Sequence, residues 1–146
     1  MEETSVQLLN QINKYTDEVL IEKEIKLNCY HTYISSFFIM PVLRHKLLSI
    51  LYIDLELNKI LKLNTEKNIL IVKFDWWKIA CVQAIENQPF AVPILRILKK
   101  LFNGNKFIKS KLLNLINLFQ IYSLEDDTKY KIKHYYRYIS YKNNLI

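Results

Sequence analysis

The residues best suited to chemistry in this chain gather between positions 73 and 98. Trp76 and Trp77 are adjacent, lysines stand at positions 73 and 78, and Pro93 opens a segment that carries Arg96. A pair of indoles on one amphipathic helix could line a groove for a lipid. The alternative is that one indole belongs to the core while the other covers a seam between helices.

The other familiar catalytic patterns are missing from the sequence. His31, His45 and His134 are isolated, and no two histidines have the spacing of a zinc site with a carboxylate nearby. The single glycine excludes glycine-rich phosphate loops, and there is no Ser-His-Asp pattern. Cys29 and Cys81 lie far apart without metal-ligand spacing, so we expect two reduced, buried thiols in a reducing compartment.

Positive charge is the other feature with a chemical consequence. The net charge is +7 and the pI is about 9.3, and a basic surface can attract nucleic acid, anionic membrane or phosphorylated substrates. The tyrosine- and lysine-rich residues 129–142 could stack on single-stranded bases. We favour another interpretation of that segment, an exposed helix surface that further chain would cover. Elsewhere the charges are scattered, as on ordinary solvated helices.

These residues must be positioned by helices. The chain has 146 residues, of which 51% are hydrophobic, with one glycine and three prolines, which predicts an all-α helical bundle rather than hairpins. We expect a single domain, with an N-terminal helical segment at residues 1–29 followed by residues 30–146. No signal peptide is expected, and Pro41 and Arg44 interrupt the most hydrophobic stretch, residues 33–57. The expected location is therefore cytoplasmic, with peripheral membrane contact as an option.

Apolar periodicity and helix-capping residues place the elements. The first helix is expected over residues 5–27, with a fresh start at Thr16, Asp17 and Glu18. Residues 28–40 form a short helix or an irregular packed segment, and Thr65 is expected to cap the helix that contains the tryptophans. The full set of later helices is predicted at residues 42–63, 65–86, 93–103, 106–122 and 129–142.

The order of these segments resembles the N-terminal half of the squalene and phytoene synthase family, which has an all-α isoprenoid-synthase fold. Residues 72–78, Val-Lys-Phe-Asp-Trp-Trp-Lys, are similar to a family helix that reads Arg-Leu-Gln-Trp-Trp-Arg. Residues 92–98, Val-Pro-Ile-Leu-Arg-Ile-Leu, resemble the family's His-Pro-Val-Ala-Arg-Ala-Leu helix. Further similar segments are residues 36–41, with the serine-aromatic-proline pattern, the acidic loop at 123–127 and the tyrosine-rich residues 134–139.

The resemblance implies a site as well as a fold. Active family members condense two isoprenoid diphosphates head to head, with Mg²⁺ ions held by two aspartate-rich motifs. The resemblance implies that Lys73, Trp77 and Arg96 contact a diphosphate or a prenyl chain. The alternative for these residues is surface charge beside a buried tryptophan.

The sequence departs from the family at the metal motifs. The first motif should end the helix at residues 42–63, where this chain has Asn58, Lys59 and Lys62. Lysines there would repel Mg²⁺, and Asp54 and Glu56 are two residues apart, so they point about 200° away from each other on a helix. The family's second motif would lie beyond the tyrosine-rich residues, and the sequence ends at Ile146 before that position. We therefore expect no cofactor here, and Mg²⁺ only in an active full-length relative.

Residues 53–60 are closer to a divergent branch of the family that also lacks the aspartates. Its mitochondrial members are assembly factors for respiratory complex I, which implies a non-catalytic, assembly-factor-like protein or a truncated relic. One alternative is the N-terminal fragment of a prenyl-diphosphate condensing transferase, and another is a basic module for nucleic acid or membrane surfaces. Exposed apolar faces at residues 42–63 and 106–122 are expected to bind a protein partner or a second copy.

Overall fold

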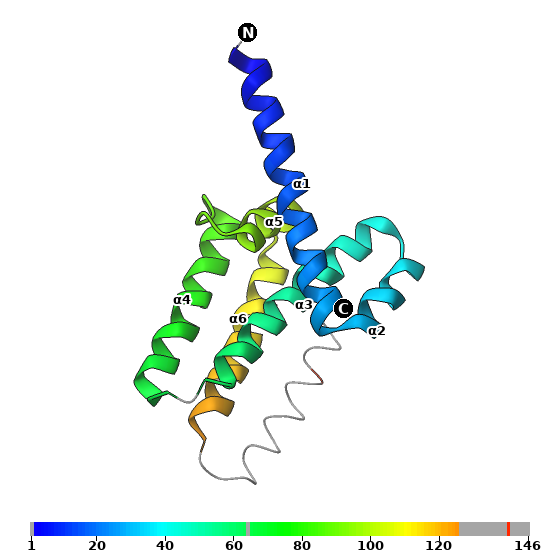
Figure 1. Ribbon diagram of the computed structural model, residues 1–146. Helices are drawn as coiled ribbons and strands as arrows, with labels where there is room; N and C mark the ends of the chain where they lie inside the picture. Colours follow the sequence, from blue (N-terminus) through cyan, green and yellow to red (C-terminus); the bar gives the residue numbers. More distant parts are fainter. Residues whose placement is uncertain (1, 64, 126–139, 141–146) are drawn as a thin grey trace.

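A computed structural model describes residues 2–63, 65–125 and 140 (Figure 1). All elements of this described part are helical and no strand occurs in it, which confirms the predicted all-α class. The elements are α1 (Glu2–Asn28), α2 (Tyr30–Ser35), the 3-10 turn η1 (Ser36–Phe38), α3 (Pro41–Leu61), α4 (Lys67–Glu86), α5 (Pro93–Phe102) and α6 (Lys106–Leu124).

Local stereochemistry sets several helix boundaries. Pro41 and Pro93 stand in the first turns of α3 and α5, where the fixed φ of proline suits a helix and its missing N–H costs nothing. Gly104 adopts φ 68°, a left-handed conformation that separates α5 from α6. Asn105 caps α6, because its side chain accepts a hydrogen bond from the Ile108 N–H at 3.1 Å.

The core forms where α4 packs on α6 and α5, while α1 packs on α5 and α3. Figure 1 shows α3 and α4 running antiparallel, with α6 beside α4. The predicted apolar face of α6 is confirmed, because Leu112, Leu115, Ile116 and Phe119 are buried. The largest fully buried side chains elsewhere in this core are Ile25, Ile53, Leu57, Phe74, Ile85, Ile94, Leu95 and Leu98.

Two expected helix starts are wrong. α1 runs without a break through Thr16, Asp17 and Glu18, because the Asp17 carboxylate is bound by Arg96 of α5 instead of capping a new turn. The N-cap of α4 is Glu66 rather than Thr65. The predicted helix at residues 129–142 lies outside the described residues.

Apolar exposure also differs from expectation. The faces of α3 and α6 that were expected to be open are mostly buried in the core. Exposed large apolar side chains instead gather at the turn before α3 and along the outer side of α4. Within the described residues, no helix is both long and apolar enough to cross a membrane.

Candidate functional site

A groove of about 490 Å³ opens between the end of α3 and the middle of α4. The two helices are joined by a short connection, but α4 packs mainly on α6 and α5, so it diverges from α3 and leaves the groove. Pockets of this size that are largely apolar, with few polar groups, are typical ligand sites. The groove is lined by Glu56, Lys59, Ile60, Leu63, Val72, Lys73, Trp76 and Trp77.

Four residues singled out in the sequence meet in this groove, namely Lys59, Lys73, Trp76 and Trp77. They come from two helices, and only the antiparallel arrangement of α3 and α4 brings position 59 next to position 73. Arg96 does not line the groove. It lies on α5, where its Nε and Nη2 atoms donate to the two Asp17 oxygens at 2.7 and 2.6 Å.

The Asp17–Arg96 pair is structural in character. The Asp17 side chain is only 6% exposed, and both of its oxygens accept a hydrogen bond from the guanidinium. This bonding raises the pKa of Arg96 above its usual value. The pair joins α1 to α5 and occupies the Nε and Nη2 edge of the guanidinium.

Lys59 stands near the end of α3, where the sequence resemblance predicted the first metal motif. Its Nζ atom lies 2.6 Å from Glu56 Oε1 and 3.6 Å from Glu24 Oε2 of α1. The hydrogen bond to Glu56 raises the pKa of Lys59, so its ammonium is charged at neutral pH. Because a cation already sits between these two carboxylates, the residues present do not fit a Mg²⁺ site.

The other residues near the expected metal motif also have structural roles. Asp54 is buried, whereas Glu56 lines the groove, so the two carboxylates face different sides of α3 as helix geometry requires. The Asn58 side-chain amide donates to the Asp54 carbonyl oxygen at 2.8 Å, and Lys62 is exposed at the C-cap of α3. Within the described residues, no group of three or more His, Cys, Asp or Glu is arranged to hold a metal.

The two tryptophans differ in how much of each side chain is exposed. Trp77 is 8% exposed and belongs to the core, whereas Trp76 is 42% exposed. The Trp76 ring meets Trp77 edge-on at 5.3 Å and stacks on Phe90 at 6.0 Å, so it covers the seam where the chain leaves α4. Both rings also line the groove, and the two interpretations of the pair are therefore compatible.

Lys73 gives the groove its available positive charge. It is exposed, and it forms no hydrogen bond or ion pair with other residues of the described part. Lys78, the second lysine flanking the tryptophans, is engaged differently, since its ammonium binds Asp75 at 3.1 Å and also Gln120 of α6. A ligand with an apolar body and an anionic head would find both partners in the groove.

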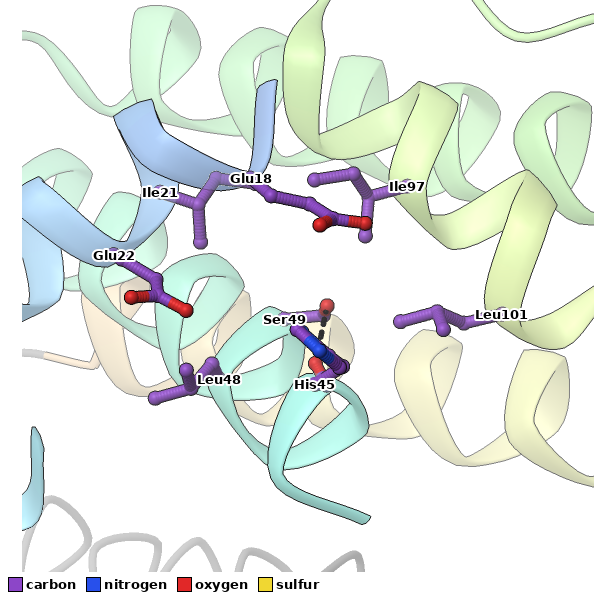
Figure 2. Close-up of a pocket in the computed structure, with 8 residues that line it drawn as sticks. All are labelled: Glu18, Ile21, Glu22, His45, Leu48, Ser49, Ile97 and Leu101. Carbon is purple, nitrogen blue, oxygen red and sulfur yellow. Dashed lines mark hydrogen bonds between the residues drawn. The ribbon is translucent and has the colours of Figure 1, made fainter. Parts of the chain in front are cut away.

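A second cavity is lined by residues that are far apart in the sequence (Figure 2). Glu18 and Glu22 of α1 lie near His45 and Ser49 of α3, a combination that could mimic a catalytic triad. The Ser49 hydroxyl donates to the His45 carbonyl oxygen at 2.8 Å, and the carboxylates bind Lys100 and Arg44. The cavity measures about 10 Å³, which is about the space of one water, so it is a packed polar contact rather than a substrate site.

Both cysteines are free thiols, as expected. Cys81 is fully buried in α4, and this burial raises the pKa of its thiol to about 12. Cys29 is half-buried before α2.

Comparison of the chain with protein-family models, with curated proteins and with solved structures finds no match.

Proposed function

We propose that this chain is a non-catalytic binding protein, similar to the divergent branch of the squalene and phytoene synthase family, whose α3–α4 groove holds an apolar ligand with an anionic head. The observation that supports a non-catalytic role is the position of Lys59 between Glu56 and Glu24. An active family member needs Mg²⁺ at this place to neutralise a departing diphosphate. Here the Lys59 ammonium binds Glu56 and lies close to Glu24, so a metal ion at this place would meet a like charge.

The ligand class follows from the lining of the groove. Ile60, Leu63 and Val72 offer aliphatic contacts and the two indoles offer flat ones, which suit a hydrocarbon chain. Glu56 is paired with Lys59, whereas the Lys73 ammonium has no such partner within the described part of the chain. A carboxylate or phosphate head would gain a charge-assisted hydrogen bond there.

Tryptophan fluorescence provides the test, because Trp76 and Trp77 are the only tryptophans and both line the groove. We expect farnesyl diphosphate to shift their emission in a saturable way, with the same Kd in MgCl₂ and in EDTA. Lys73→Gln should weaken binding about tenfold, since a hydrogen bond to a charged group contributes about 1.5–3 kcal/mol. Lys62→Gln is the matched control, because Lys62 lies outside the groove.

Each alternative function predicts a different result with the same ligand or with RNA. Release of inorganic diphosphate that requires Mg²⁺ would mean a prenyl-transferring enzyme and would refute the non-catalytic proposal. An absence of any saturable emission change would refute the groove as the binding site. Salt-sensitive binding of single-stranded RNA by a chain that ignores the diphosphate would favour the basic module.

A further inference from the structure

An exposed apolar tip spans η1, the connection after it and the first turn of α3, and we define it as Phe37, Phe38, Met40, Val42 and Leu43. Phe38 is 90% exposed and Met40 is 69% exposed, the first being the most exposed large apolar side chain among the described residues. α2, which leads into this tip, buries none of its own residues. Figure 1 shows α2 and the connection to α3 standing out to one side of the bundle.

The tip is held in one conformation. Ser36 is buried, its hydroxyl donates to the Tyr33 carbonyl oxygen at 2.6 Å, and it accepts from Arg44 Nε at 3.1 Å. Arg44 also binds Glu22 at 2.8 Å and lies 4.4 Å from the centre of the Phe37 ring. An ordered turn therefore presents the apolar side chains. Little conformational entropy is lost when these side chains leave water and are buried elsewhere.

Among the described residues, the stretches of chain beside the tip carry no acidic side chains. The sequence has no Asp or Glu between residues 25 and 53, nor between residues 87 and 124. These two stretches meet beside the tip, where Ile39, Leu43 and Lys46 share a pocket with Asn105. Next to Asn105 stands Lys106, followed by Phe107, which is 63% exposed and lies under the Lys111 ammonium. The carboxylate of Glu22 is neutralised by Arg44.

We propose that the apolar tip inserts into the surface of a bilayer that contains anionic lipids. Protruding Phe, Met, Val and Leu side chains with lysines beside them match the chemistry of that surface, because the apolar groups enter the acyl boundary while the ammonium groups remain among the phosphates. The protein would lie on the membrane through this tip. The surface is separate from the α3–α4 groove, so the inference does not depend on the function proposed for the groove.

Sedimentation with vesicles tests the proposal on the full chain. We expect binding to vesicles of phosphatidylcholine mixed with phosphatidylserine, much weaker binding to phosphatidylcholine alone, and release by salt. The double variant Phe38→Gln, Met40→Gln should lower the partition coefficient at least about tenfold, given the energy of burying such side chains. Ile79→Gln, which removes an apolar group that is 57% exposed on α4, should bind like the wild type.

Folding does not confound this comparison, because all three substituted side chains are exposed and their thermal melts can be checked by circular dichroism. Undiminished vesicle binding by the double variant would overturn the proposal in favour of a diffuse electrostatic contact. So would an equal loss in Ile79→Gln, equal binding to both vesicle types, or no binding of the wild type to either.

Discussion

Arg96 and Lys100 both lie on α5, and each binds a carboxylate of α1. The environments of the two pairs differ. Arg96 holds Asp17 with two hydrogen bonds, and the Asp17 side chain is 6% exposed. Lys100 contacts Glu18 through a single hydrogen bond at 2.6 Å, and the Glu18 side chain is 28% exposed. Burial of the acceptor decides which pair matters, because a carboxylate cut off from water cannot replace its lost partner.

Substitution of the two cations should separate these cases. Arg96→Gln is expected to lower the free energy of unfolding by about 1–2 kcal/mol, the lower part of the range for charged hydrogen bonds because the guanidinium is itself partly solvated. Lys100→Gln is expected to cost less than about 1 kcal/mol, as exposed pairs do. Urea unfolding of both variants measures the difference. Equal losses would contradict the structural role given to the Asp17–Arg96 pair.

At the scale of the element, α4 is the informative helix because it is apolar on two sides. One side, with Leu70, Phe74 and Ile85, is buried against α5 and α6. The other carries Ile69, Val72, Trp76 and Ile79, which are all exposed and spaced three or four residues apart. The periodicity that predicted a helix here is therefore shared by both faces, and it does not say which of them faces the core.

Two isoleucines of α4 provide a matched test of this assignment. Ile85 is fully buried and Ile79 is 57% exposed. Ile85→Ala should lower the free energy of unfolding by about 2–5 kcal/mol, because it leaves a cavity in the core. Ile79→Ala should stay within about 0.5 kcal/mol of the wild type. Chemical denaturation of the two variants measures both values, and a reversed order would mean that α4 is rotated relative to this structure.

At the scale of the whole molecule, the open question in the sequence was how the N-terminal segment relates to the rest. Ile21 and Ile25 of α1 belong to the same hydrophobic core as α3 to α6, and Asp17 is tied to α5. The beginning of α1, in contrast, extends away from the other helices (Figure 1). The second half of α1 is thus part of the bundle, although it precedes the stretch that carries the family resemblance.

Truncation distinguishes the two halves of α1. A chain that lacks residues 1–15 should unfold within about 0.5 kcal/mol of the full chain, because the beginning of α1 extends away from the other helices (Figure 1). A chain that lacks residues 1–26 loses both isoleucines and should be destabilised by about 4 kcal/mol or more. Urea midpoints provide the measurement. If the longer deletion left stability unchanged, the segment would be an independent appendage.

Much of the candidate site could be anticipated residue by residue, but its assembly could not. Adjacent tryptophans beside lysine drew attention to α4, and the lysines at the end of α3 argued against a metal there. Arg96 was grouped with Lys73 and Trp77 only through the resemblance, and its partner Asp17 lies 79 residues away in the sequence. The role of Lys59 likewise depends on Glu24, which another helix supplies.

The sequence by itself determined the all-α class and several helix boundaries, because proline and glycine act through the local backbone. Pro41, Pro93 and Gly104 stand where the structure places them for reasons that need no distant contact. Only the tertiary structure decided which face of α4 is buried, where the α3–α4 groove opens and which apolar side chains protrude before α3. These features depend on how distant helices pack, and local periodicity carries no information about the partner of a helix face.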